Sequence, residues 1–384
     1  MRRSAGRILT THCGSLPRPA ALLDLMKAKV NGEPVDTAAY QLQVRAAVAE
    51  SVRKQGECGI DIVTDGEQSK TGFFAYVRER LNGFEPGAAP SSAPFAEEVE
   101  TFPEYYAEYF SHAMLGGAIA PRVFLECTGP ISYRGQEALQ RDIENLKAAI
   151  GGLGAQEAFL PAVAPSGVGT NRFYKTAEEY WQGIADAMHA EYQAIVDAGF
   201  LVQIDDPFLA EWFSYSSAGD EERRKTGEMY VEAVNHALRG IPAEKVRFHT
   251  CYGINEGPRL HDAPLGDFVD LMLKVNAGAY SFEAANPRHE HEYHVWEHVK
   301  LPEGKILIPG VVTHASNIVE HPELIAERIV RYAKLVGRDN VIAGTDCGFS
   351  SQATYHPEVH PKVIWAKFRA MAVGARLATE QLWR

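Results

Sequence analysis

Short runs of apolar and β-branched residues recur along the chain, and longer stretches with helical periodicity lie between many of them. The short runs predict strands at Arg7–Thr11, Ile60–Thr64, Arg122–Glu126, Ala158–Ala162, Leu201–Asp205, Val246–Thr250, Ala279–Glu283, Lys305–Pro309 and Asn340–Gly344. The longer stretches predict helices at Thr37–Gly56, Thr176–Ala198, Gly219–Leu238, Pro264–Val275 and Pro322–Val336. Strands that alternate with helices favour βαβ units and a parallel sheet. We therefore expect one α/β domain over residues 1–384, a (β/α)8 TIM barrel, with one of the nine candidate strands outside the barrel.

One segment, from about residue 84 to residue 121, departs from this alternation. Its first part, residues 85–94, is rich in Pro, Ala, Ser and Gly, and an aromatic, acidic stretch around Tyr105 and Tyr109 follows. Long loops inside compact domains are usually functional lids or mobile insertions, although a solvated excursion on the side of a barrel fits equally well. We expect a long loop insertion after the second strand.

Composition and charge exclude several classes of protein. Lys and Arg number 38 and Asp and Glu 50, a formal net charge of −12 that disfavours nucleic acid and anionic membranes as partners. The sequence has no apolar run of 18 residues and no signal-peptide pattern, so we expect a cytoplasmic protein. The five cysteines, at positions 13, 58, 127, 251 and 347, are too scattered for a disulfide framework, which makes metal ligation or catalysis the more informative question.

Polar side chains gather where the predicted strands end, which is where a barrel places its catalytic groups. These ends carry His12-Cys13-Gly14-Ser15, Asp65-Gly66-Glu67, Asp205-Asp206, His249-Thr250-Cys251, Glu283 and Asp346-Cys347. His249 and Cys251 are two residues apart on a strand, so their side chains point to the same side and their Cα atoms lie about 6.5–7 Å apart. With Glu283 and Cys347 they could complete a four-coordinate metal site, although a strand histidine and a buried cysteine often only pack.

A set of one imidazole, two thiolates and one carboxylate favours zinc, because sulfur ligands are soft. Two thiolates and one carboxylate against a charge of +2 leave such a site at −1, which makes the ion a poor Lewis acid for activating water. The same ion can bind an incoming thiol and hold it as a nucleophilic thiolate. The chemistry therefore indicates alkylation of sulfur rather than hydrolysis.

Six segments together resemble the cobalamin-independent methionine synthase family, over essentially the whole chain and in the order of its catalytic C-terminal barrel. They are Thr11-His12-Cys13-Gly14-Ser15-Leu16-Pro17-Arg18-Pro19, Asp65-Gly66-Glu67, Gln203-Ile204-Asp205-Asp206-Pro207, His249-Thr250-Cys251, Ser281-Phe282-Glu283 and Thr345-Asp346-Cys347-Gly348. The resemblance implies a methyltransferase of methionine biosynthesis that moves a methyl group from a methyltetrahydrofolate-like donor to homocysteine. It also implies a Zn²⁺ site made of His249, Cys251, Glu283 and Cys347.

The resemblance further implies that Ser15, Glu67 and Asp205 hold the amino-acid part of homocysteine, with Glu67 and Asp205 near its ammonium. A buried ammonium needs carboxylate partners, which makes this assignment physically reasonable. The alternative for Asp205 is a turn or helix-cap residue before the next helix.

The chain also departs from the family. Full-length members carry a second, N-terminal barrel for which 384 residues leave no room, and Cys13 stands where an apolar residue is expected, so we interpret it as a small core residue. Single-barrel relatives include a branch that resembles epoxyalkane:coenzyme M transferases, so the thiol could instead be coenzyme M and the alkyl donor an epoxide. A metal-free decarboxylase of the uroporphyrinogen decarboxylase type and a non-catalytic zinc- or thiol-binding protein are further alternatives. A homo-oligomer remains open.

A histidine cluster follows Glu283 directly, in residues 286–294. His291 and His294 are three residues apart, which would place them on one face of a helix. One of them could protonate the leaving group as a general acid, which makes both candidate catalytic residues. The alternative is a solvated helix start.

Overall fold

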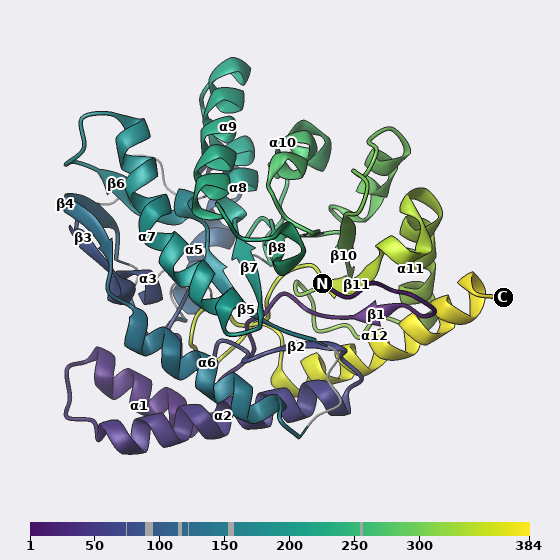
Figure 1. Ribbon diagram of the computed structural model, residues 1–384, viewed down its shortest axis with the longest axis horizontal. Helices are drawn as coiled ribbons and strands as arrows, with labels where there is room; N and C mark the ends of the chain where they lie inside the picture. Colours follow the sequence, from purple (N-terminus) through teal and green to yellow (C-terminus); the bar gives the residue numbers. More distant parts are fainter. Residues whose placement is uncertain (74, 89–94, 114–116, 122, 153–156, 254–255) are drawn as a thin grey trace.

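Eight parallel strands form a nearly closed barrel in the computed structural model of this chain (Figure 1). The structure describes residues 1–384 except 74, 89–94, 114–116, 122, 153–156 and 254–255. The barrel strands are β1 (Leu9–Thr10), β2 (Ile62–Thr64), β5 (Glu157–Val163), β7 (Leu201–Asp205), β8 (Val246–His249), β9 (Ala279–Phe282), β10 (Ile306–Val312) and β11 (Ile342–Thr345). Each pairs in parallel with its neighbours in the order β1-β11-β10-β9-β8-β7-β5-β2. Between β2 and β1, the amide of Asp61 donates to the carbonyl oxygen of Thr10 at 3.1 Å.

The strand that the barrel does not use is the third one predicted, Arg122–Glu126. Its last two residues begin β4 (Leu125–Tyr133), residues 123–124 precede that strand, and residue 122 lies outside the described residues. β4 pairs antiparallel with β3 (Leu81–Pro86) and parallel with β6 (Thr170–Asn171) in a separate three-stranded sheet beside the barrel (Figure 1). The expectation that one of the nine strands lies outside the barrel is thereby confirmed.

Helices surround the barrel, as the alternating pattern predicts. The α-helices outside the insertion are α1 (Ala20–Val30), α2 (Thr37–Glu57), α3 (Ala75–Arg80), α6 (Gln136–Ile150), α7 (Ala177–Asp197), α8 (Pro207–Tyr215), α9 (Asp220–Ala237), α10 (Val269–Lys274), α11 (Pro322–Val336) and α12 (Pro361–Leu382). The predicted helix Pro264–Val275 is divided into the 3₁₀ turn η3 (Leu265–Asp267) and α10. Within the described residues, none of the helices is both long and apolar enough to span a bilayer.

Apolar side chains fill the amino-terminal end of the barrel and leave its other end to polar groups. Seven of the eight strands contribute to one buried cluster, which consists of Leu9, Ile62, Phe159, Leu201, Ala279, Ile306, Ile308 and Ile342. A second and larger cluster packs the outer faces of the strands against the helices. Because apolar side chains fill the barrel at the amino-terminal ends of its strands, a ligand can enter only at the carboxyl ends.

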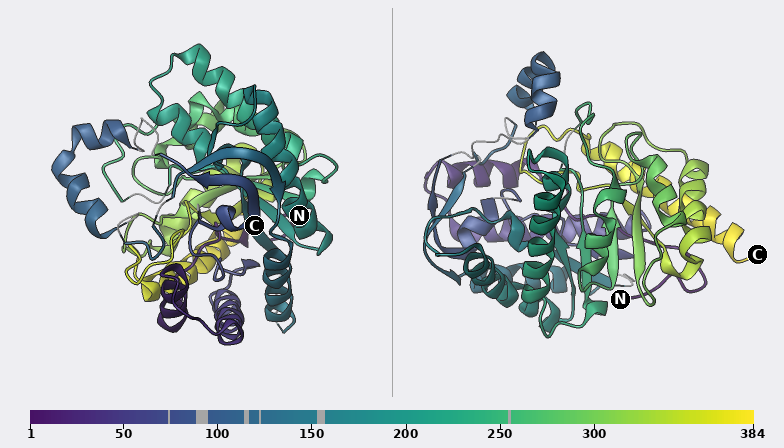
Figure 2. Two further views of the ribbon diagram at one scale, coloured as in Figure 1. Left: turned by 90° about the vertical axis from the view of Figure 1, so that its left-hand side faces the viewer. Right: turned by 90° about the horizontal axis from the view of Figure 1, so that it is seen from above.

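The insertion after β2 contains two helices as well as loops. They are α4 (Ala96–Thr101) and α5 (Pro103–His112), which project from the barrel in Figure 2. The hydroxyl of Tyr109 donates to Oε1 of Glu358 at 2.5 Å, and the amide of His261 donates to Oε1 of Glu98 at 2.8 Å. These contacts connect the insertion to the loops at the barrel mouth. Residues 89–94 and 114–116 of the expected loop lie outside the described residues.

Candidate active site at the carboxyl end of the barrel

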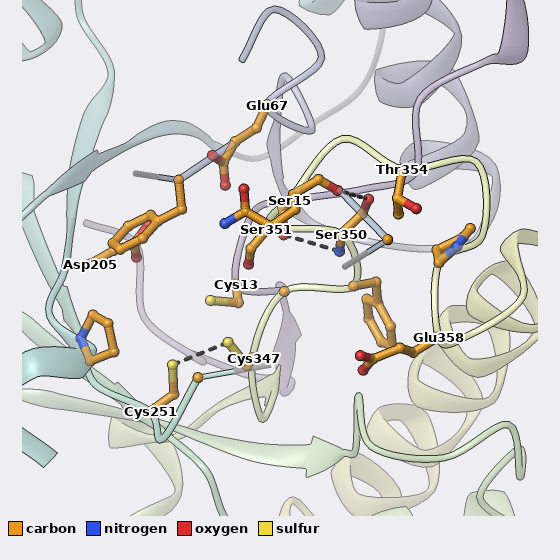
Figure 3. A pocket seen from close by; sticks show the side chains of 18 of the residues that line it. Cys13, Ser15, Glu67, Asp205, Cys251, Cys347, Ser350, Ser351, Thr354 and Glu358 are labelled. Carbon is orange, nitrogen blue, oxygen red and sulfur yellow. Dashed lines mark hydrogen bonds between the residues drawn. The ribbon is translucent and has the colours of Figure 1, made fainter. Parts of the chain in front are cut away.

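A cavity opens at the carboxyl ends of the barrel strands, and side chains from five strand ends line it (Figure 3). These residues follow or end β1, β2, β7, β8 and β11, and they are Cys13, Ser15, Glu67, Asp205, His249, Cys251 and Cys347. The structure thus brings together the three predicted substrate-binding residues and three of the four predicted metal ligands. It also places Cys13 among them.

Three thiols meet on one side of this cavity. The Sγ atoms of Cys251 and Cys347 are 3.1 Å apart. The Sγ atoms of Cys13 and Cys347 and a ring nitrogen of His249 all lie within 4.8 Å of one another. Figure 3 shows the three sulfur atoms facing the same part of the cavity. Such a group of soft donors could hold a zinc-like cation.

His249 has one ring nitrogen hydrogen-bonded and the other without a partner among the described residues. Its Nδ1 is hydrogen-bonded to Oγ of Ser281 at 3.2 Å, and its buried Nε2 has no hydrogen-bond partner among the described residues. Burial, helped by the nearby cation of Arg247, lowers the pKa of His249 to about 3, so the ring is neutral. A neutral imidazole fixed at one nitrogen and free at the other is the usual form of a metal-binding histidine.

The thiols of this cluster have raised pKa values. Burial raises the pKa of Cys13 to about 12. The hydrogen bond with Cys347, together with burial, holds the pKa of Cys251 well above its usual value. Without a positive charge in the cluster, these groups therefore stay protonated. Because metal binding deprotonates thiols, binding should release protons.

Glu283, the fourth predicted ligand, has other partners in this structure. Its Oε1 accepts the amide of Tyr252 at 2.9 Å, and its Oε2 accepts Nδ2 of Asn286 at 2.8 Å. Nη1 of Arg259 lies 2.8 Å from the same Oε2. Glu283 is grouped by distance with His314 and Asp346, not with Cys13, His249 and Cys347.

Two buried carboxylates face the cavity from β2 and β7. Oε2 of Glu67 has no hydrogen-bond partner among the described residues, and the ammonium of Lys70 lies 3.6 Å away from it. Oδ1 of Asp205 accepts Nε2 of Gln203 at 2.8 Å. Burial, and then the charge of Glu67, raise the pKa of Asp205 well above its usual value. A cationic group entering here would stabilise both carboxylates.

The backbone presents Glu67 to the cavity in a constrained conformation. Glu67 has a φ of 56°, in the left-handed region that residues other than glycine rarely adopt. Its amide donates to Oδ1 of Asp65 at 2.9 Å, and its carbonyl oxygen accepts Nη2 of Arg18 at 2.9 Å. Strain of this kind is usually found at functional sites.

Ser15 and Asp205 line the cavity, and the helix-capping role belongs to the residue after Asp205. Oγ of Ser15 lies at the cavity wall and accepts the amide of Ser350 at 3.3 Å. The residue that caps α8 is Asp206, whose Oδ1 accepts the amide of Leu209 at 3.1 Å. Asp205 is therefore free of the capping role and directed to the cavity.

The structure does not bring His291 and His294 to this cavity. Both are exposed on the 3₁₀ helix η4 (Glu290–Glu297), and neither is among the described residues that line the cavity. Nδ1 of His294 lies 2.9 Å from Oε1 of Glu297 on the surface. The geometry therefore gives no support to an acid role for these two histidines.

Two buried residues near the site were missed by the sequence analysis. His314 follows β10 by two residues, and the predicted strand ended too early, at Pro309, to include it. Arg247 precedes His249 by two residues on β8, and its guanidinium lies 3.8 Å from the ring centre of Phe159 inside the barrel. Reading β8 for alternation would have placed Arg247 on the same side as His249.

Comparison with known proteins assigns the chain to a family. The family model described as "Cobalamin-independent synthase, Catalytic domain" matches residues 8–93 and 170–366. The chain is 26% identical to a protein named methionine synthase from Sulfolobus acidocaldarius over 97% of this chain and 93% of the relative. It is 25% identical to another from Saccharolobus islandicus, over 98% and 96%.

Solved structures share the fold. A B12-independent methionine synthase from a Shewanella species, in complex with selenomethionine, has a TM-score of 0.73 at 20% identity and covers 98% of this chain and 99% of its own. A putative enzyme of the same type from Listeria monocytogenes has a TM-score of 0.67 at 19% identity, over 98% and 99%. Because the family model matches most of the chain, including every strand end that lines the cavity, this protein belongs to the cobalamin-independent synthase family and carries its catalytic domain.

Proposed function

We propose that this enzyme transfers a methyl group to the sulfur of homocysteine from a methyltetrahydrofolate-like donor. The observation that carries the proposal is the arrangement of one cavity, with thiols and an imidazole on one side and two buried carboxylates on another. An amino-acid thiol has matching ends, a sulfur and an ammonium. Relatives along the full length of the chain are named methionine synthase, which agrees with this substrate.

The donor set fits a zinc ion. His249, Cys251 and Cys347 would hold it together with one more anionic donor, for which the family resemblance indicates Glu283. The unpartnered Nε2 of His249 and the clustered thiols support this fit. When bound, zinc lowers the pKa of a coordinated thiol and keeps its sulfur nucleophilic at neutral pH.

The chain's own residues position the substrates. Asp205 and Glu67 bind the ammonium of homocysteine, and Ser15 lies beside them at the cavity wall. Phe73, Phe95 and Phe349 also line the cavity and offer aromatic surfaces against which a flat donor ring can pack. Holding sulfur and methyl carbon within about 3–3.5 Å, in line with the leaving atom, supplies much of the acceleration.

Coenzyme M is a less suitable thiol for this cavity. It carries a sulfonate in place of the amino-acid group, and therefore brings no cation to Glu67 and Asp205, the two buried acidic side chains that a positive charge would stabilise. A metal-free decarboxylase would leave the cluster of Cys13, Cys251, Cys347 and His249 without a role. These features favour homocysteine and thiol alkylation.

The test is an assay with purified, zinc-loaded protein. Homocysteine and a methyltetrahydrofolate should yield methionine, measured by mass spectrometry. Cys347→Ser should abolish turnover, whereas Cys58→Ser, at the end of α2 and outside the cavity, should not. Formation of a thioether from coenzyme M and an epoxide, with no methionine from homocysteine, would contradict the proposal.

A further inference from the structure

We propose that Cys13 is itself a ligand of the metal and takes the coordination position that the family resemblance gives to Glu283. This inference rests on the proposed function, because it concerns the metal that the proposed chemistry uses. It changes the expected donor set from two sulfurs, one nitrogen and one oxygen to three sulfurs and one nitrogen.

Cys13 lies among the other sulfur and nitrogen donors. Its Sγ, the Sγ of Cys347 and a ring nitrogen of His249 lie within 4.8 Å of one another, which is the spacing of donors around one ion. Cys251 adds its sulfur 3.1 Å from that of Cys347. All four side chains are buried, and Nε2 of His249 has no hydrogen-bond partner among the described residues. Four donors of the kinds that zinc prefers therefore face one small volume.

The negative charge of Glu283 is already balanced by a buried arginine. Both of its oxygens accept hydrogen bonds, from the amide of Tyr252 and the side chain of Asn286, and Arg259 forms an ion pair with it at 2.8 Å. To bind a metal, Glu283 would have to give up its ion pair with the buried guanidinium of Arg259, which would keep only Asp262 as a partner, and breaking a buried ion pair is costly. Cys13 loses no comparable ion pair when it binds.

The net charge of the metal site is the same with Cys13 as with Glu283. Three thiolates against a charge of +2 leave the site at −1, the same value as two thiolates and one carboxylate. Replacing Glu283 by Cys13 therefore keeps the electron-rich character that sulfur alkylation needs, with a softer donor set.

A buried cation supports negative charge on Cys13. Nη1 of Arg247 donates to Oγ1 of Thr11 at 3.0 Å, and its Nη2 donates to the carbonyl oxygen of His12 at 3.1 Å. These are the two residues that precede Cys13. The guanidinium of Arg247 therefore lies beside the backbone that leads from β1 to Cys13.

The experiment counts sulfur ligands on the bound metal. Protein stripped with a chelator is loaded with Co²⁺ or Zn²⁺ alone, and the thiolate-to-cobalt charge-transfer band and X-ray absorption of the zinc protein are recorded. We expect three sulfurs in the wild type and two in Cys13→Ala, with about one third of the charge-transfer intensity lost. Zinc affinity of Cys13→Ala, measured by chelator competition, should fall about 100-fold or more, beyond the effect of losing an outer-shell partner.

Matched variants separate the two donor sets. Glu283→Gln should keep three sulfurs and an unchanged charge-transfer band, and Cys58→Ala should behave as the wild type. Two sulfurs in the wild type, unchanged in Cys13→Ala, would overturn the inference, and this measurement does not depend on whether Glu283→Gln folds. If such a two-sulfur protein still forms methionine, only the role of Cys13 fails. If the wild type binds no metal, both the inference and the metal part of the proposed function fail.

Discussion

Nη1 of Arg259 lies 2.8 Å from Oε2 of Glu283, and both side chains are almost completely buried. The same guanidinium is 2.8 Å from Oδ2 of Asp262 through its Nε. Arg259 itself has a φ of 59°, in the left-handed region. One strained, buried arginine therefore balances two carboxylates beside the thiol cluster.

Removing this arginine should destabilise the protein strongly. Arg259→Met leaves Glu283 buried without its cation and leaves Asp262 with His289 as its remaining ion-pair partner, and breaking a buried pair typically costs about 3–5 kcal/mol. Urea unfolding of the metal-free protein measures the loss. In Arg259→Met/Glu283→Gln the penalty should be smaller than the sum of the two single changes, because the uncompensated carboxylate is gone.

An exposed pair provides the control for this prediction. Arg376 and Glu380 are 2.9 Å apart, one turn apart on α12, and exposed. Arg376→Met should change the free energy of unfolding by no more than about 0.5 kcal/mol. Equal effects of Arg259→Met and Arg376→Met would contradict the importance assigned to burial.

Asp205→Asn should weaken the binding of homocysteine selectively. A hydrogen bond to a charged group is worth about 1.5–3 kcal/mol, so KM for homocysteine should rise roughly 10- to 150-fold. Steady-state kinetics with homocysteine and with a thiol that lacks an amino group separate this effect from general damage. The second thiol should react at the wild-type rate. An equal loss with both thiols would contradict ammonium binding at Asp205.

Removal of the metal should make two of the five thiols oxidisable to a disulfide. The sulfurs of Cys251 and Cys347 are 3.1 Å apart and, without a cation, no longer held as separate ligands. Chelated protein treated with a thiol oxidant and then denatured should show three free thiols, whereas zinc-loaded protein should show five. Cys347→Ser is the matched control and should lose none. Loss of two thiols from the zinc-loaded protein would mean that these sulfurs are not ligands.

The sequence predicts the barrel well because its strands and helices are local patterns. Helix α11 has the predicted bounds, Pro322–Val336, since its proline and its apolar spacing mark both ends. The third strand was harder to place, because β4 has the one-sided burial of an open sheet and a short run of residues does not reveal this. Which strands pair with which is a property of the closed fold.

In the candidate site, too, the sequence predicts what depends on local pattern and does not predict what depends on the closed fold. Strand ends identified Glu67, Asp205, His249 and the cysteines, since a barrel gathers its strand ends at one face. The proximity of Cys13 to Cys347, at opposite ends of the chain, depends on the parallel pairing of β1 with β11 and could not be read from spacing. The ion pair between Glu283 and Arg259 could not be read from the sequence either, because it joins two segments that only the fold brings together.

The histidine cluster shows that the sequence does not predict which face of a helix is buried. Helical spacing put His291 and His294 on one face of a helix, but it could not say which way that helix is turned. In the structure the face is exposed, and the buried member of the cluster is His289. Orientation is decided by packing against the rest of the chain, which no local pattern contains.

His289 should make the stability of the protein depend on pH. Its Nε2 lies 3.0 Å from Oδ2 of Asp262 and its Nδ1 2.9 Å from Oε2 of Glu292. Burial alone lowers the pKa of His289, but the hydrogen bonds to Asp262 and Glu292 outweigh it and raise the pKa to about 9. The pKa is thus higher in the folded chain than the value of about 6.5 expected in the unfolded one.

Because the pKa of His289 is higher in the folded than in the unfolded chain, the protein should be more stable at low pH than at high pH. A raised pKa contributes stability that is fully present below about pH 6.5 and is lost as the pH rises through about 9, by up to roughly 3 kcal/mol. Urea unfolding of the metal-free protein between pH 6 and pH 9.5 measures it. His289→Gln should be less stable than the wild type at pH 6 and should approach it at pH 9.5. His294→Gln, whose side chain is 57% exposed, should follow the wild type at every pH. A difference between His289→Gln and wild type that does not change with pH would show that His289 is neutral in the folded protein.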